Sequence, residues 1–195
     1  AVVDSRNEIA ESDDGNNGRQ LAISVKAAPP AEPTTQTLHR TARSGDVSTG
    51  GSDNRLRVGI APHGNGIRAL LDFDLAQLPG LDNQARILDA DLNLNSYSGD
   101  CFEFLGPLRV YQVNYGATID YDDYSSAPKA TVLTAASSAN IYNPIDITAR
   151  IQNFILQEGA SHYQLRLQLK GDNLGKAYAC MMEWSDATLI VKYQP

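Results

Sequence analysis

The eight residues Arg68–Leu75, with the sequence RALLDFDL, constrain the fold of this chain more than any other stretch. Side chains two positions apart share one face of an extended strand. One face would therefore carry the apolar residues Ala69, Leu71, Phe73 and Leu75. The opposite face, which we expect to meet solvent, would carry Arg68, Leu70, Asp72 and Asp74. The stretch predicts a half-buried strand, and such a strand needs a core to pack against.

Two similar stretches lie on either side of it. Asp53–Ile60 precedes it, separated by a turn with the sequence HGNG at His63–Gly66, and Ile87–Tyr97 follows it. We expect these three strands to be successive neighbours in one antiparallel sheet. The segment before them, Arg43–Asn54, is rich in Gly, Ser and Thr and is predicted to be a long polar loop.

The rest of the chain predicts more short strands and one helix. The helix, within Asp146–Gly159, has a stripe of apolar residues, with Asp146 or Thr148 as its cap and Gly159 at its end. The further strands are expected at 35–42, 108–114, 130–135, 143–148, 162–169, 177–183 and 187–193. Many short strands with a single helix predict an all-β fold, a two-sheet β-sandwich of jelly-roll type.

Length and charge narrow the class of protein further. A chain of 195 residues predicts one domain plus an extension. We divide it into an N-terminal extension, 1–34, and a sandwich domain, 35–195. No run reaches the roughly 20 apolar residues of a membrane-spanning helix, so we expect no membrane insertion. The net charge of −7 argues against nucleic acid as a partner, because phosphate binding needs a basic surface.

The two cysteines, Cys101 and Cys180, are expected to form one disulfide in an exported protein; two reduced thiols in a cytosolic protein are the alternative. The first residue, Ala1, is not Met, which is typical of a product of signal-peptide cleavage. We therefore expect an extracellular or cell-surface protein, secreted through a cleaved signal peptide.

Several stretches resemble one known family. DNRLR at Asp53–Arg57, the strand at Arg68 and its turn up to Gly80, ILDADLNL at Ile87–Leu94 and PIDITARIQNFI at Pro144–Ile155 resemble the extracellular DNRLRE domain. The resemblance covers roughly 35–193 and implies a sandwich similar to carbohydrate-binding modules, on secreted proteins. Val58 follows Arg57 where the family name has Glu.

The N-terminal extension contains one strand-like segment. Leu21, Ile23 and Val25 alternate with smaller or polar residues within 21–26, and the proline-rich sequence AAPPAEP follows directly. An isolated strand on a tether has no fold of its own. It must pair either with an edge of its own domain or with an edge of a neighbouring molecule.

The aromatic residues indicate a second kind of site. Aromatic rings stack on the apolar faces of sugars while polar groups bind the hydroxyls. Tyr121 and Tyr124, in a polar loop, and Trp184 are the candidate carbohydrate-binding residues.

No catalytic or cofactor motif is recognisable, and no cofactor is required by the sequence. Asp120, Asp122 and Asp123 are candidate oxygen ligands for a structural Ca²⁺, although acidic loops are usually only solvated. The carboxylate pairs Asp72 with Asp74 and Asp89 with Asp91 have the pattern of a glycosidase pair. A solvent-exposed strand face explains both pairs more simply.

Two functions follow from these observations. The first is a non-catalytic subunit of an extracellular filament, matrix or surface assembly, in which copies of the protein join by donating the 21–26 strand. The second is a module that binds an extracellular polysaccharide. A hydrolase or lyase lacks the residues it would need.

Overall fold

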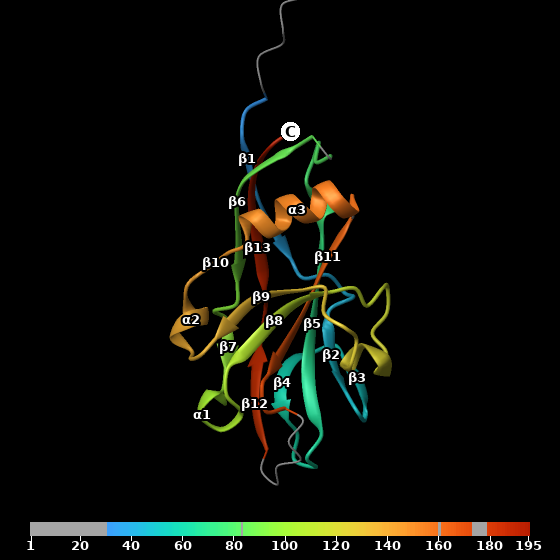
Figure 1. Cartoon of the computed structure of the whole chain (residues 1–195), viewed down its shortest axis with the longest axis vertical. Coiled ribbons are helices and arrows are strands. Elements are labelled where there is room, and N and C mark those ends of the chain that lie inside the picture. The colour runs from blue at the N-terminus through green and yellow to red at the C-terminus, as the bar shows by residue number, and fades with distance from the viewer. Residues whose placement is uncertain (1–30, 83, 160, 173–178) are drawn as a thin grey trace, which may run out of the picture. The chain divides into compact units, whose positions relative to one another are not determined.

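The computed structural model describes residues 31–82, 84–159, 161–172 and 179–195. The chain divides between Pro30 and Ala31 into two units. The second unit, Ala31–Pro195, consists of two antiparallel sheets that pack against each other, and Figure 1 shows their strands. The predicted β-sandwich is confirmed. The structure differs from the sequence-based expectations in which strands share a sheet and in which faces are buried.

The smaller sheet, which we call sheet A, has the strand order β1–β13–β6–β10. Leu38, Leu189 and Leu92 are opposite one another across three of its strands and are all buried. This row forms one side of the core. The strands of sheet A are β1 (Thr34–His39), β13 (Thr188–Gln194), β6 (Arg86–Asn93) and β10 (Ile145–Asp146).

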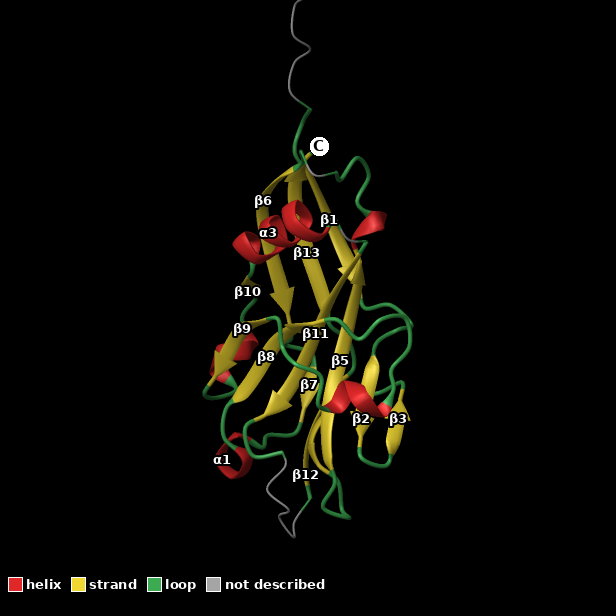
Figure 2. Cartoon of the chain, turned by 45° about the vertical axis from the view of Figure 1, so that its right-hand side comes forward, coloured by secondary structure: helices red, strands yellow, loops and turns green. Residues whose placement is uncertain are grey.

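The larger sheet, sheet B, has the order β7–β12–β4–β5–β11–β8–β9. A hairpin of β2 and β3 pairs with β5 beside it, and Figure 2 shows β2 and β3 alongside β5. The strands are β2 (Gly45–Ser48), β3 (Gly51–Asp53), β4 (Leu56–Ile60), β5 (Gly66–Asp74), β7 (Tyr97–Ser98), β8 (Leu108–Val113), β9 (Ala130–Ala135), β11 (His162–Leu169) and β12 (Cys180–Trp184).

The predicted helix is α3 (Thr148–Glu158). Asp146 Oδ1 accepts the Thr148 N–H at 2.9 Å, and Gly159 ends the helix in the left-handed conformation. Its apolar stripe of Ile151, Phe154 and Ile155 is buried. The sequence did not predict the single-turn helices α1 (Phe102–Leu105) and α2 (Ala139–Tyr142), or the 3-10 turns η2 (Leu75–Gln77) and η3 (Tyr121–Tyr124).

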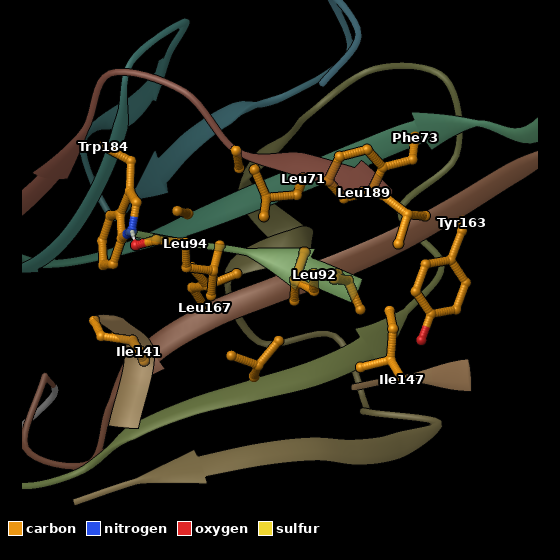
Figure 3. Close-up of a cluster of buried hydrophobic side chains, with 14 of the residues drawn as sticks. Leu71, Phe73, Leu92, Leu94, Ile141, Ile147, Tyr163, Leu167, Trp184 and Leu189 are labelled. Carbon is orange, nitrogen blue, oxygen red and sulfur yellow. Dashed lines mark hydrogen bonds between the residues drawn. The ribbon is translucent and has the colours of Figure 1, made fainter. Parts of the chain in front are cut away.

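The core lies between the sheets, and Figure 3 shows its centre. Leu71 and Leu167 of sheet B face it, as do Leu92 and Leu189 of sheet A. The apolar face that the alternation in Arg68–Leu75 predicts therefore faces the core, as expected.

One expectation about sheet membership is wrong. β4 and β5 are neighbours in sheet B, but β6 lies in sheet A. The connection that contains η2 carries the chain from one sheet to the other, and Tyr193 Oη of sheet A donates a hydrogen bond to the Pro79 carbonyl there at 3.0 Å. Alternation reports that a strand has one buried face, but it does not say in which sheet the strand lies.

The predicted polar loop at Arg43–Asn54 is also wrong, because it contains the β2–β3 hairpin. Its residues are mostly small and polar, so they lack the apolar alternation of a strand. β2 is held by its pairing with β5 from Gly45 to Ser48 and buries Val47 on the outer face of sheet B.

The outer face of β5 is buried rather than exposed, which corrects the expectation for Arg68, Leu70 and Asp72. The hairpin and the segment 114–129 contribute the cover over this face, where a second small core forms. Its buried members are Val47, Leu70, Val113 and Tyr115. Alternation missed this layer because most of the buried side chains that face it are polar.

The disulfide Cys101–Cys180 is present, as predicted. It joins the residue before α1 to β12 across 79 positions of sequence. Among the described residues, no helix is both long enough and apolar enough to cross a bilayer.

Candidate functional site

The predicted donor strand, Leu21, Ile23 and Val25 within 21–26, lies outside the described residues. The described chain begins immediately before β1, where Gln194 Nε2 donates a hydrogen bond to the Ala31 carbonyl at 2.7 Å. Strand donation also requires an acceptor, which is a sheet edge of the sandwich that can receive a strand. The described residues show which edges are open.

Helix α3 closes one edge of sheet A. β10 pairs with only two residues of β6, and side chains of α3 take the place of a strand along the rest. Thr148 Oγ1 accepts the Ala90 N–H at 2.8 Å, and Gln152 Oε1 accepts the Ile87 N–H at 2.8 Å. A donated strand has no free N–H to bind at either position.

In the described chain, two longer strands remain at sheet edges: β1 pairs only with β13, and β9 pairs only with β8. Edge strands are usually protected from further pairing by charged residues or proline. β1 reads TTQTLH and β9 reads ATVLTA, so neither contains proline, lysine or an acidic residue. These two edges resemble acceptor edges more than protected ones.

A groove lies at the start of β9, where Ala130 lines it. A cavity of about 200 Å³ lies between β9, the end of β8 and one side of α3. Arg150 Nη2 of α3 reaches across and donates a hydrogen bond to the Thr131 carbonyl at 2.8 Å. The lining residues are Gln112, Lys129, Ala130, Arg150, Asn153, Phe154, Gln157 and Glu158. We call this cavity the β9–α3 groove.

A larger cavity of about 490 Å³ adjoins the groove and shares Lys129, Phe154 and Glu158 with it. Lys129 Nζ and Glu158 Oε2 form an ion pair at 2.6 Å. The far end of the larger cavity is lined by Arg43, Asn114 and the β11 residues His162 and Gln164, among others.

A buried carboxylate lies beneath the larger cavity. Asp72 is fully buried and accepts hydrogen bonds from Thr41 Oγ1 at 2.5 Å and from Gln164 Nε2 at 3.0 Å. His162 Nδ1 lies 3.0 Å from Asp72 Oδ2, the same oxygen that Thr41 binds. The pairing of Asp72 with Asp74 as an exposed carboxylate pair is therefore wrong. Asp72 and His162 support the floor of the cavity, and no single-residue pattern in the sequence indicates their contact.

The second carboxylate pair, Asp89 with Asp91, lies on a solvent-facing strand face, as expected. Asp89 is exposed and Asp91 half-buried on the outer face of sheet A. Partial burial and the nearby charges of Asp89 and Asp146 raise the pKa of Asp91.

The three candidate carbohydrate-binding residues do not form one surface. Tyr121 is 59% exposed on η3, whereas the Tyr124 ring covers the Arg68 guanidinium at 4.0 Å. Trp184 is 2% exposed in the core, where its Nε1 donates to the Leu94 carbonyl at 2.8 Å. Trp184 is therefore a core residue, and Tyr124 is part of the cover over sheet B.

Trp184 nevertheless lies beside a different polar cavity, of about 350 Å³, at the β7 edge of sheet B. Tyr97, half-buried, packs against Trp184 with ring centres 5.8 Å apart. The remaining lining is rich in amide, hydroxyl and carboxylate groups: Asn95, Ser96, Ser98, Glu183 and Ser185. Tyr97 is the aromatic residue of this cavity that the sequence analysis did not identify.

The predicted calcium ligands have structural roles at η3. Asp120 Oδ1 accepts the Asp122 N–H at 2.9 Å, and Asp123 Oδ2 accepts the Asp120 N–H at 2.8 Å, which forms a capping box. Burial raises the pKa of Asp123. In the part of the chain that the structure describes, no group of three or more acidic, histidine or cysteine side chains is arranged to hold a metal ion.

Comparison with known proteins adds no assignment: no family model and no curated protein matches this sequence. The DNRLRE resemblance remains an expectation from sequence motifs.

Proposed function

We propose that this protein is a non-catalytic, secreted structural subunit that assembles with copies of itself. Each copy donates the strand segment Leu21–Val25 to a sheet edge of a neighbour, and the product is a filament or another extracellular assembly. The observation that carries this proposal is the pair of long edge strands, β1 and β9, that contain no protective charge or proline.

Strand donation accounts for the arm and for the edges together. A free edge presents unpaired N–H and carbonyl groups, and an added strand satisfies them with main-chain hydrogen bonds. Alternate side chains of the added strand provide specificity by entering pockets. The arm supplies a segment whose apolar residues alternate, joined to the sandwich by a short proline-rich linker.

The disulfide supports the proposed setting. A bond between Cys101 and Cys180 is typical of proteins in oxidising compartments, such as secreted and cell-surface proteins. An extracellular location, reached through a cleaved signal peptide, is the simplest place for such an assembly.

The test compares two full-length variants that place the same charge on opposite faces of the arm strand. Ile23→Asp puts a carboxylate on the face that we expect to be buried, and should abolish filaments seen by negative-stain electron microscopy. Ser24→Asp changes the charge equally on the opposite face and should leave them intact. The proposal fails if the wild-type chain is monodisperse in oxidising buffer, or if the two variants assemble equally well.

A second function, binding of an extracellular polysaccharide, is favoured by the cavity beside Tyr97. Its volume of about 350 Å³ lies within the roughly 300–1,000 Å³ common for ligand sites. An aromatic wall with amide, hydroxyl and carboxylate groups around it suits a pyranose ring, which has apolar faces and polar edges. The two functions are compatible in one matrix protein.

Tyr97→Leu tests this second function. It should lower the affinity for any glycan that binds the wild-type protein at least about tenfold, a loss of 1.4 kcal/mol or more, as measured by calorimetry after a glycan array. Tyr142→Leu, at a ring 69% exposed and outside the cavity lining, is the control. If Tyr121→Ala abolishes binding instead, the glycan binds at η3 and the cavity beside Tyr97 is not the site.

A further inference from the structure

We infer that the β9–α3 groove is the acceptor site, and that its occupant is the segment Leu21–Val25 of a second copy of this chain. The inference rests on the proposed function and adds the acceptor edge to it. Of the two open edges, β9 is favoured by its hydrogen bonding, its neighbouring apolar residues and the charge of the groove.

The hydrogen-bonding state of β9 points to an edge that is covered but not paired. The Thr131 carbonyl accepts a hydrogen bond from Arg150 Nη2 at 2.8 Å, and Arg150 is an exposed side chain of α3. A main-chain N–H of an incoming strand can take the place of this guanidinium, which then returns to water. At the β6 edge the groups are instead bonded to Thr148 and Gln152, which are half-buried and less easily displaced.

The neighbouring apolar residues suit the arm strand. Val132 and Leu133 of β9 and Ile145 of β10 are half-buried and pack against the main core. A strand added along β9 extends this apolar surface, and the alternating Leu21, Ile23 and Val25 supply side chains to cover it. Ala22 and Ser24 would then face outward.

The charge of the groove complements the charge of the arm. Arg43, Lys129 and Arg150 line the groove and its adjoining cavity, and Glu158, which pairs with Lys129, is the one acidic residue that lines either of them. The twenty residues that precede Leu21 carry five acidic side chains, at Asp4, Glu8, Glu11, Asp13 and Asp14, against two arginines, Arg6 and Arg19. Attraction between opposite charges steers association and fixes register.

The tether between the donated strand and the sandwich is short. Residues 26–30 separate Val25 from Ala31, and an extended chain spans about 3.3 Å per residue, so the tether spans at most about 20 Å. A copy that receives the strand must therefore lie close to the donor. Pairing within one chain is tested separately from pairing between chains.

Cysteine cross-linking between differently labelled full-length chains tests the inference. One chain carries Ala22→Cys, the other carries Thr131→Cys on β9, and mild oxidation of the mixture should give a disulfide-linked heterodimer on a non-reducing gel. The matched control partner carries Thr37→Cys, an exposed threonine on the other open edge, β1. We expect at least about tenfold more heterodimer with Thr131→Cys, corresponding to a preference of 1.4 kcal/mol or more.

The outcomes separate this inference from the proposed function. Linkage mainly to Thr37→Cys overturns the inference that the groove is the acceptor. Strand donation then stands, with β1 as the acceptor edge. Linkage within a single chain that carries both Ala22→Cys and Thr131→Cys, with none between chains, overturns donation to a neighbour. Absence of linkage to either edge, in a sample that still forms filaments, overturns the groove as acceptor.

A groove-filling pair of variants provides the second test. Asn153→Trp places an indole in the groove from α3, whereas Leu156→Trp places the same side chain at another exposed position of α3 outside the groove lining. Assembly, measured by the pelletable fraction, should fall at least about tenfold for Asn153→Trp and stay at the wild-type level for Leu156→Trp. Wild-type assembly of Asn153→Trp overturns the inference.

Discussion

At the scale of single residues, the outer face of sheet B is notable because charged side chains are buried there with partners. Arg68 Nε pairs with Asp172 Oδ2 at 2.7 Å, and Arg68 also donates to the Tyr124 carbonyl. Arg166 Nη1 donates to the Ser126 carbonyl at 2.6 Å. A buried guanidinium without partners is costly. Asp172 and carbonyl groups of the segment 114–129 therefore provide the hydrogen-bond acceptors for the arginines on this face.

Tyr163 is the contrasting residue, because its hydroxyl is buried without a hydrogen-bond partner among the described residues. Its ring packs edge-on against Phe154 at 5.0 Å between centres. An unsatisfied buried hydroxyl costs about 1–3 kcal/mol, so Tyr163→Phe should raise the free energy of unfolding by about 1 kcal/mol at pH 7. Urea denaturation measures it; a loss of stability would show that Tyr163 Oη has a partner.

The stability difference between Tyr163→Phe and the wild type should also depend on pH. Burial raises the pKa of Tyr163 far above its ordinary value of 10.0, so the folded protein keeps this proton where the unfolded chain loses it. Unfolding then releases a proton, and stability falls as the pH rises above about 10. The advantage of Tyr163→Phe over the wild type should therefore grow between pH 9 and 11, by up to about 1.4 kcal/mol per pH unit above the unfolded pKa. Tyr142→Phe, at an exposed ring, is the control for which no such growth is expected.

At the scale of elements, the close approach of β4 to β12 depends on Gly59. Gly59 has φ +132°, and a Cβ there would collide with the Cys180 carbonyl oxygen of β12. Gly51, in the β2–β3 hairpin, has a similar φ of +128° and open space around it. Alanine substitutions at the two glycines can therefore be compared to separate the effect of crowding from the effect of backbone strain.

Gly59→Ala should destabilise the protein more than Gly51→Ala does. Strain at positive φ costs about 1–3 kcal/mol at either position, and the collision with β12 adds about another 1–3 kcal/mol at Gly59 alone. Urea denaturation of the two variants measures the difference. Equal losses would show that β12 can move away from β4 without cost.

Helix α3 has two roles at this scale. Its Thr148 and Gln152 side chains close the edge of β6, while Arg150, on another part of the helix, reaches the Thr131 carbonyl of β9. One helix therefore closes an edge of sheet A and forms one wall of the groove beside sheet B.

At the scale of the whole molecule, the disulfide and the sheets connect distant parts of the 31–195 unit. The 79-residue separation of Cys101 and Cys180 gives about 4–5 kcal/mol of stabilisation in the chain-entropy treatment. β1 enters sheet A next to β13 near the end of the chain. The described chain therefore enters the sandwich at a strand that is already paired.

Most strands and the main helix could be predicted from the sequence, because their patterns are local. Alternation placed β5 and β11, and the apolar stripe with Gly159 placed α3. The disulfide followed from there being only two cysteines. The groups of the candidate site were not predictable together, since Thr131 and Arg150 are 19 positions apart and Asp72 and His162 are 90 apart.

The sequence by itself determined that this chain forms short strands with one apolar face each, because that information is carried by residues two positions apart. Only the tertiary structure decided which strands share a sheet, that the polar face of β5 is buried under the 114–129 segment, and that β9 is left at an edge beside α3. The physical reason is that these properties depend on contacts between segments far apart in the chain. A carboxylate such as Asp72 has the same local pattern whether water or Gln164 provides its hydrogen bonds.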